Sequence, residues 1–319
     1  MIISSLVTDF LEYLELERNS SQKTIRNYHH YLQRFIDFTG DIEPKAIDLA
    51  LIRKYRLYLA RYTDPKSGEN LKRKTQNYFM IALRAFLRYL ARQDIPSLSA
   101  EKVELGEQDP SPLKVLDDDN LGRLLNAPDT SDQSGLRDKA ILEMLFSTGL
   151  RVSELANLNI DQINLKRREF GIVGKGGKER VVFLSDSAVE WIEKYLNHRT
   201  DPYKPLFIRF QGTKDPLEDG EKMRLTTRSI ERIVKKYVTE SGIPISATPH
   251  TLRHNFATDL LINGADIRSV QEMLGHSNIS TTQIYTHITN RQLKDVHKAF
   301  HGKTRAFVEN PENDLDKNS

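Results

Sequence analysis

Residues 249–285 read PHTLRHNFATDLLINGADIRSVQEMLGHSNISTTQIY, and this stretch predicts the local fold around several reactive side chains. Pro249 favours the start of a helix, because its missing N–H costs nothing at the first helical position. Gly264 follows an apolar run and indicates where that helix ends. Asp266 can then cap a second helix, which Gly275 ends. Short helices joined by tight turns can therefore bring four reactive side chains together: His250, Arg253, His276 and Tyr285.

A metal site is one alternative interpretation of the histidines in this stretch. His250 and His254 would share one helix face, and His276 could join them. However, Thr251 stands where a zinc hydrolase motif has glutamate, and Arg253 between the two histidines would repel a cation. We therefore expect no metal site.

A second motif, STGLRVSELANL at 147–158, places an arginine where a helix begins. Gly149 predicts the end of one helix, and Arg151 predicts the start of the next. The N-terminal end of a helix favours anions, so a cation there is best used with an anion beside it, which a phosphate would supply. Glu154, one turn later, is placed to hold the guanidinium. The alternative is an ordinary surface pair between Arg151 and Glu154.

A third motif, FGIVGKGGKERVVFL at 170–184, predicts a β-hairpin, because β-branched residues flank a glycine-rich turn. Lys175 and Lys178 lie at the turn. The motif is not a phosphate-binding loop of the Walker type, since it lacks that spacing and opens no helix. A solvated basic hairpin is the alternative interpretation.

Composition limits the class of protein. The 319 residues suffice for two domains, and the absence of cysteine excludes disulfides and fits a cytoplasmic protein. No apolar run is long enough for a membrane span, and the acidic N-terminal segment lacks the basic start of a signal peptide. The net charge is only +3, but residues 53–92 hold eleven Lys or Arg against Asp64 and Glu69. This basic block favours nucleic acid as a partner, with a solvated helix face as the alternative.

Helical spacing and turn residues divide the chain. Residues 1–105 show four amphipathic helical segments and are predicted to form one helical domain. A polar, proline-bearing linker at 106–113 separates it from a second domain at 114–300. The segment 301–319 is polar and predicted to be a disordered tail, and 211–222 is predicted to be an exposed loop.

Two of the predicted helices carry basic faces. Arg84 and Arg88 lie one turn apart on the fourth helix of the first domain, opposite its apolar stripe. Arg228 and Arg232 lie one turn apart on a helix predicted from Thr226 to Val238. We expect all four arginines to contact DNA.

Taken together, HTLRHNFAT, LGHSNISTTQIYTH, TGLRVSEL and GKGGKER resemble the signature of the tyrosine recombinases, or phage integrase family, and most of all its Xer-type members. The segment SQKTIRNYHHYLQRFIDF is similar to the family's N-terminal domain. The resemblance implies a mainly α fold with a small β-hairpin. It also implies two parts, a helical SAM-like core-binding domain and an integrase catalytic domain.

The resemblance further implies an attack on a phosphodiester without metal or other cofactor. Tyr285 would be the nucleophile, and Arg151 and Arg253 would grip the phosphate. The remaining implied roles are base or hydrogen-bond partner for His250, acid for Lys175, phosphate contact for His276, and DNA-backbone contact for Lys178 and Arg180. The product would be a 3′-phosphotyrosyl link, and strand exchange would pass through a Holliday junction.

The family resemblance also predicts partners. They are double-stranded DNA sites and a tetramer of recombinases, either four identical chains or a mixture with a paralogous recombinase. A short helix at 290–300 would dock on a neighbouring protomer. Resolution of chromosome or plasmid dimers and integration of a mobile element both remain open, as do a type IB topoisomerase and a catalytically inactive DNA-binding protein.

Overall fold

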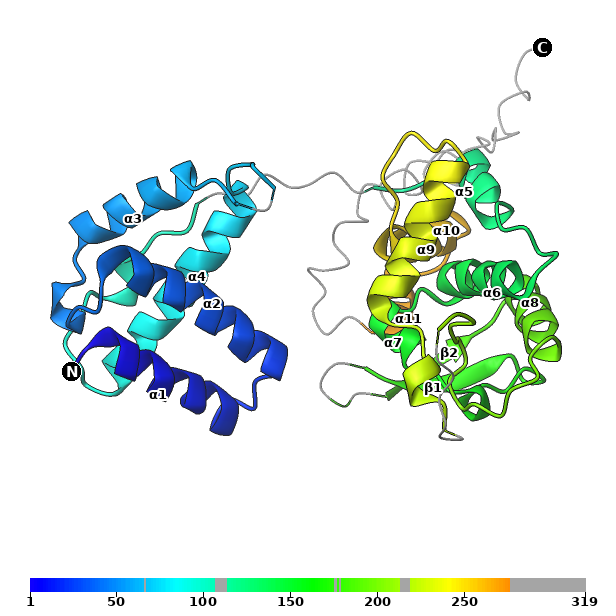
Figure 1. Ribbon diagram of the computed structural model, residues 1–319, viewed down its shortest axis with the longest axis horizontal. Coiled ribbons are helices and arrows are strands. Elements are labelled where there is room, and N and C mark those ends of the chain that lie inside the picture. The colour runs from blue at the N-terminus through cyan, green and yellow to red at the C-terminus, as the bar shows by residue number, and fades with distance from the viewer. Residues whose placement is uncertain (66, 107–113, 175–176, 178, 213–218, 276–319) are drawn as a thin grey trace, which may run out of the picture. The chain divides into compact units, whose positions relative to one another are not determined.

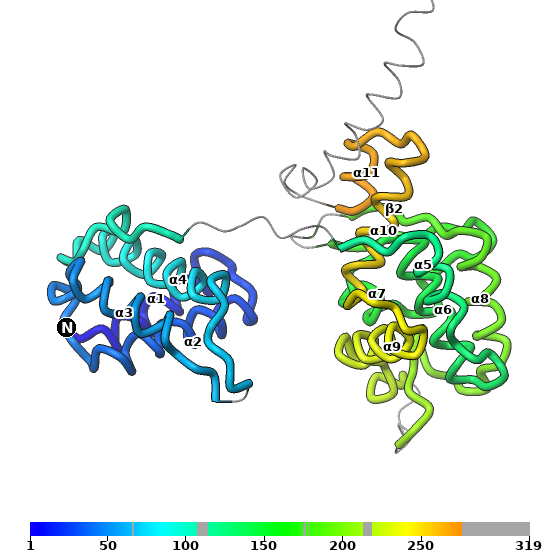
Figure 2. The backbone as a smooth tube through the Cα atoms, turned by 90° about the horizontal axis from the view of Figure 1, so that it is seen from above, coloured from blue at the N-terminus to red at the C-terminus, as the bar shows by residue number. Residues whose placement is uncertain are grey.

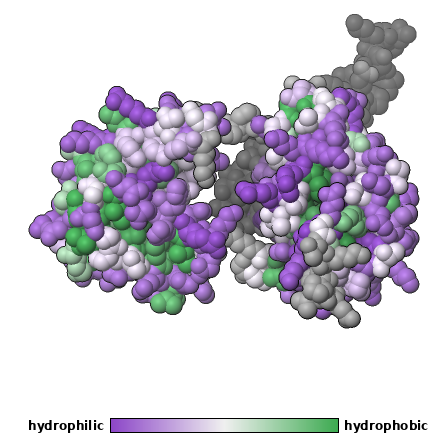
Figure 3. Space-filling view, in the orientation of Figure 1, coloured by the Kyte–Doolittle hydropathy of each residue, from purple (hydrophilic) through white to green (hydrophobic). Residues whose placement is uncertain are grey.

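The computed structural model describes residues 1–319 except for 66, 107–113, 175–176, 178, 213–218 and 276–319. The chain divides into two compact units, Met1–Ser111 and Pro112–Ser319 (Figure 1 and Figure 2). Within the described part of the chain, no helix has the length and apolar character needed to cross a bilayer. The visible face of each unit is mainly hydrophilic, with smaller apolar patches (Figure 3).

The first unit is built from four α-helices whose apolar stripes meet in one core. Large side chains fill that core, including Phe10, Phe35, Tyr55 and Phe86. Burial of such stripes supplies most of the stability of helices this short. The helices are α1 (Ile3–Leu16), α2 (Gln22–Thr39), α3 (Leu49–Arg61) and α4 (Arg73–Arg92), with short 3₁₀ turns at Pro44–Ala46 and Ala100–Lys102.

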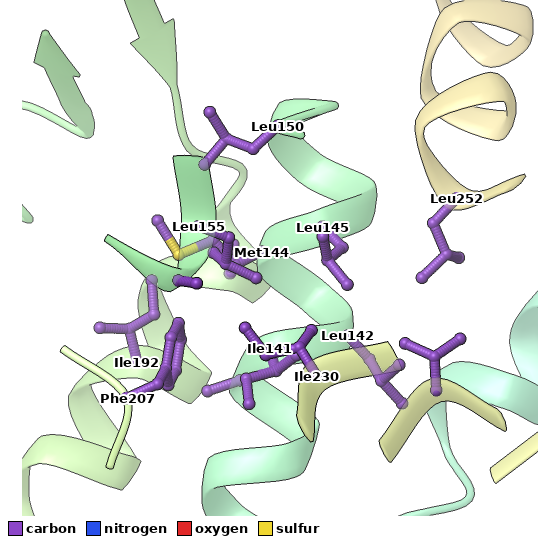
Figure 4. Packing of buried hydrophobic residues seen from close by; sticks show 14 of the residues in the cluster. Ile141, Leu142, Met144, Leu145, Leu150, Leu155, Ile192, Phe207, Ile230 and Leu252 are labelled. Atoms are coloured by element: carbon purple, nitrogen blue, oxygen red, sulfur yellow. The ribbon is translucent and has the colours of Figure 1, made fainter. Parts of the chain in front are cut away.

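The second unit surrounds one central helix, α6 (Gln133–Thr148), which is buried along most of its length. Ile141, Leu142 and Leu145 of this helix pack among side chains from several other helices, including Ile230 and Leu252 (Figure 4). The other helices are α5 (Asp118–Leu125), α7 (Val152–Ala156), α8 (Asp186–Asn197), α9 (Thr227–Glu240), α10 (Pro249–Ile262) and α11 (Ile267–Leu274), with 3₁₀ turns at Ile160–Gln162 and Glu221–Met223.

A two-stranded antiparallel sheet lies beside these helices. It pairs β1 (Glu169–Val173) with β2 (Glu179–Phe183), in a register that sets Ile172 opposite Arg180 and Phe170 opposite Val182. Since side chains alternate between the faces of a strand, these four share one face. Phe170, Ile172 and Val182 are buried, so Arg180 starts from the inner face of the hairpin.

The mainly helical fold with a small sheet is confirmed. Three further predictions, the 290–300 helix, the 301–319 tail and half of the 211–222 loop, fall outside the described residues. The exact domain bounds stay a prediction.

Candidate active site

Helix α10 carries His250 and Arg253 and begins where the sequence predicts. The hydroxyl of Thr248 accepts a hydrogen bond from the backbone N–H of Thr251, and Pro249 occupies the first turn. The side chain of Arg253 points inward, and the residue is only 2% exposed. It donates to the carbonyl of Gly149 at 2.5 Å and to that of Leu274 at 2.6 Å. Arg253 therefore joins three segments: α10, the end of α6 and the end of α11.

Arg151 is the N-cap residue of α7, two residues after Gly149 ends α6 in the left-handed conformation. Its Nη1 lies 2.8 Å from Oε1 of Glu154, and its Nη2 donates to the carbonyl of Gly275 at 3.1 Å. The side chain of Arg151 is 35% exposed, so it is only partly covered by the protein. A Cβ at Gly149 would come within 2.4 Å of the Phe256 ring, so the close approach of α6 to α10 requires glycine there.

Arg180, which the sequence predicts to contact the DNA backbone, is held by contacts within the protein. The Arg180 side chain is 9% exposed, and its two Nη atoms donate to both oxygens of Glu154 at 3.2 and 2.8 Å. Its Nε donates to the carbonyl of Met273 at 3.0 Å. The physical reason is the strand register, which places Arg180 on the inner face of β2 beside the start of α7.

Glu154 links the two arginines with one carboxylate. It also accepts a 2.9 Å hydrogen bond from the backbone N–H of Arg151. Burial by itself raises the pKa of Glu154, but the hydrogen bonds from Arg180 and Arg151 outweigh it and lower the pKa to about 2. Glu154 is therefore ionised at neutral pH and holds both guanidiniums.

The rings of His250 and His254 meet edge to face on one face of α10, with centroids 4.3 Å apart and an interplanar angle of 64°. Partial desolvation, followed by the charges of Arg253 and Arg151, lowers the pKa of His250 below its usual value. Burial, followed by His250 and Arg253, lowers the pKa of His254 to about 4. Both rings are thus neutral at pH 7, and a neutral imidazole at His250 can accept a proton.

Four of the predicted site residues lie outside the described residues: Lys175, Lys178, His276 and Tyr285. The described segments lead up to three of them. Val173 is the last residue of β1 and Glu179 is the first residue of β2, so the two strands flank the lysines in the sequence. Gly275, in the left-handed conformation, caps α11 immediately before His276 in the sequence.

The four arginines predicted to contact DNA lie on two helices. In the first unit, Arg84 and Arg88 of α4 both approach Glu101, at 3.9 and 3.0 Å. In the second unit, Arg228 and Arg232 are exposed on α9. Arg232 donates a hydrogen bond to the hydroxyl of Ser229 at 3.4 Å. Among the described residues, no group of three His, Asp or Glu side chains is arranged to hold a metal ion.

Family models match both units of the chain. One described as the phage integrase family matches residues 114–292, and one described as the phage integrase N-terminal SAM-like domain matches residues 7–94. The tyrosine recombinase XerD of Listeria monocytogenes is 38% identical over 311 residues, covering 94% of this chain and 99% of that protein. The tyrosine recombinase XerD of Lacticaseibacillus casei is 37% identical over 299 residues, covering 93% and 98%.

Solved structures share the fold. The Tn1549 transposon integrase, in complex with transposon right-end DNA, aligns with a TM-score of 0.71 at 20% identity, covering 94% of this chain and 99% of that one. The XerH site-specific recombinase, bound to a palindromic difH substrate, aligns with a TM-score of 0.66 at 22% identity, covering 92% and 84%. At these identities the likeness shows the fold alone.

Proposed function

Since the chain belongs to the phage integrase family of tyrosine recombinases, we propose that its arginine site cuts and rejoins DNA at specific sites. The observation that carries this role is the convergence of Arg151 and Arg253 on the end of α11. Two guanidiniums from separate helices meet there, one residue before His276. Planar guanidiniums suit the non-bridging oxygens of a phosphodiester and stabilise the charge that grows in the transition state.

Tyr285 is the nucleophile in this proposal. A phenol has a pKa of roughly 10, so ionising it at pH 7 costs about 4 kcal/mol, and the site must take the proton during attack. His250 is proposed to accept that proton or to form a hydrogen bond with the phenol. The lowered pKa of His250 supports this role, because it keeps the ring neutral at pH 7.

Lys175 is the proposed acid that protonates the departing 5′ oxygen, and His276 is the proposed hydrogen-bond partner of a phosphate oxygen. The enzyme becomes linked to the 3′ phosphate through Tyr285, and this bond conserves the energy of the broken one. A second DNA end then attacks the link and releases the tyrosine. The cycle needs neither ATP nor a metal ion.

Double-stranded DNA and other recombinase protomers are the proposed partners, in the cytoplasm. Strand exchange through a Holliday junction requires four active sites, from four identical chains or from a mixture with a paralogous recombinase. The long match to XerD proteins at 37–38% identity favours dimer resolution of the Xer type. The alternative is integration of a mobile element, for which the Tn1549 integrase offers a likeness in fold.

The first prediction concerns Tyr285→Phe, which removes only the phenolic oxygen. This variant should bind DNA as tightly as the unaltered protein and form no covalent adduct. A denaturing gel with a nicked suicide substrate in EDTA measures the adduct. The matched control is Tyr78→Phe, which removes a phenolic oxygen from a side chain that is 40% exposed in the first unit and should leave the adduct intact.

An adduct from Tyr285→Phe would contradict the assignment of the nucleophile. Loss of all cleavage in EDTA, restored by a divalent ion, would contradict metal-independent chemistry. Relaxation of supercoiled plasmid that lacks any target site would instead favour a type IB topoisomerase.

A further inference from the structure

Three consecutive carbonyls at the end of α11 each accept a hydrogen bond from a different arginine. The carbonyl of Met273 accepts from Nε of Arg180 at 3.0 Å. The carbonyls of Leu274 and Gly275 accept from Arg253 at 2.6 Å and from Arg151 at 3.1 Å. The last carbonyls of a helix lack partners within the helix and carry partial negative charge, so cations are favoured there. The end of α11 thus serves as a common anchor for three guanidiniums.

We propose, on the basis of the recombinase function above, that Arg180 is a positioning residue that fixes the orientation of Arg151 and the end of α11. Two contacts carry the inference. Arg180 grips both oxygens of Glu154, the carboxylate that also holds Arg151. It also reaches a carbonyl 93 residues later in the sequence, so one side chain ties β2 to α7 and α11.

Arg180 and Arg151 differ in how many of their side-chain nitrogens are engaged with protein oxygens. At 9% exposure, and with Nε, Nη1 and Nη2 all donating to protein oxygens, the Arg180 side chain is held within the protein. The side chain of Arg151 is 35% exposed, and its hydrogen bonds to protein acceptors use Nη1 and Nη2. Arg151 can therefore meet a phosphate, whereas Arg180 acts through Glu154.

Gly275 shows how closely Arg180 packs against the turn before His276. Gly275 has a φ of +63°, and a Cβ there would lie 2.9 Å from Nη1 of Arg180. The guanidinium therefore supports this turn directly. If Arg180 is shortened, Glu154 is left with Arg151 as its main partner, and both Arg151 and the end of α11 gain freedom to move.

Arg180→Lys is the informative variant, because it keeps one positive charge but cannot bond both Glu154 oxygens and the Met273 carbonyl together. Arg180→Gln, a neutral variant that retains one donor group, serves as a second substitution. Each is compared with Arg151→Lys and with the double variant Arg151→Lys/Arg180→Lys. The measurements are the DNA Kd, the cleavage rate at saturating suicide substrate, and the unfolding temperature.

Arg199→Lys is the matched control. Arg199 is also buried, pairs with Asp201, and donates to the carbonyls of Tyr203, Pro205 and Leu206. It belongs to the same unit but makes none of the site contacts described above. The control should lower the unfolding temperature to a similar extent and leave the cleavage rate of the folded protein unchanged.

We expect Arg180→Lys and Arg180→Gln to keep the DNA Kd within about twofold and to slow cleavage by about 10- to 100-fold, since misplacing a catalytic group by about 1 Å can cost that much. The double variant should be little slower than Arg151→Lys, because both changes disturb the same guanidinium.

A weaker Kd with unchanged cleavage at saturation would make Arg180 a DNA contact and overturn the inference. Rate losses that add fully in the double variant would also overturn the inference, and so would an equal loss of cleavage rate in Arg199→Lys. If Arg151→Lys itself cleaves at the normal rate, the proposed function of the site fails instead.

Discussion

At the scale of residues, the site keeps an excess of positive charge by the way it holds its arginines. Glu154 offers one carboxylate to Arg151 and Arg180 together. The remaining contacts of these arginines and of Arg253 are made largely by backbone carbonyls, which orient a guanidinium without cancelling its charge. A cluster of this kind is fixed in place before DNA arrives and remains attractive to a phosphate.

The pKa of His254 leads to a prediction on stability. Burial, His250 and Arg253 lower this pKa to about 4, whereas an unfolded histidine titrates near 6.5. Below pH 6.5 His254 binds a proton in the unfolded chain but not in the folded chain. The free energy of unfolding should therefore decrease progressively as pH falls from 6.5 to about 4. His250, whose pKa is also lowered, adds to the same loss. Urea unfolding at pH 7, 6, 5 and 4 measures it, and His254→Gln should flatten the dependence.

Glu154→Gln is the control for this experiment. The pKa of Glu154 is lowered to about 2, so its contribution to stability is complete above pH 4.5 and is lost only as pH falls from there toward 2. The glutamine variant should therefore leave the slope between pH 6.5 and 4.5 unchanged. If His254→Gln leaves that slope unchanged too, His254 is not the group that titrates.

At the scale of elements, two buried asparagines hold the chain at the first residue of the predicted linker and shortly after its end. Asn77 of α4 donates to the carbonyl of Gly106 at 2.7 Å and accepts from its N–H at 3.0 Å. Asn255 of α10 donates to the carbonyl of Leu116 at 2.6 Å and accepts from the N–H of Leu116 at 3.0 Å. Each side-chain amide thus satisfies both backbone groups of one residue, as a neighbouring strand would. Each clamp belongs to its own unit and fixes one residue close to the linker.

We predict that Asn255→Ala destabilises the second unit by about 1–3 kcal/mol, because it leaves the buried polar groups of Leu116 without partners. Hydrogen exchange followed by mass spectrometry should show faster exchange at Leu116 and unchanged exchange at Gly106. Asn77→Ala is the matched control and should give the reverse pattern. Equal effects of either variant at both positions would show that the clamps do not act independently.

Elements that depend on local hydrogen bonds could be predicted from the sequence. Asp266 caps a helix as predicted, and its side chain accepts hydrogen bonds from the N–H groups of Arg268 and Ser269. Gly149 and Gly275 end helices in the left-handed conformation that glycine tolerates best. These signals lie within a few residues of the feature that they predict.

The position of Arg180 could not be predicted in this way. Val181, Val182 and Phe183 are all apolar, so alternation does not reveal which face of β2 is buried. The partners of Arg180 are also distant, 26 residues earlier at Glu154 and 93 residues later at Met273. The clamps by Asn77 and Asn255 escape prediction for the same reason, since their partners lie 29 and 139 residues away.

At the scale of the whole molecule, a recombinase must restrain its own active sites. If four protomers cut two DNA sites together, both duplexes would break, so only some of the protomers can be active at one time. Each protomer must therefore sense its neighbour. The segment NRQLKDVHKAF at 290–300 follows Tyr285 closely, and its sequence places Leu293, Val296 and Phe300 on one predicted helical stripe. An isolated helix this short is marginal in water, so its apolar stripe needs a surface on which to dock.

We predict that a chain ending at Thr289 still binds a single DNA site but loses the assembly of paired sites and recombination, with weak or unregulated cleavage. Removal of the segment would uncouple Tyr285 from the neighbouring protomer. Gel-shift assays with one and two sites measure binding and pairing, and a two-site plasmid measures recombination. The matched control ends at His301 and lacks only the polar segment 302–319, so it should recombine at the full-length rate. If the chain ending at Thr289 also recombines at that rate, residues 290–300 do not couple the protomers, and the restraint must come from another contact.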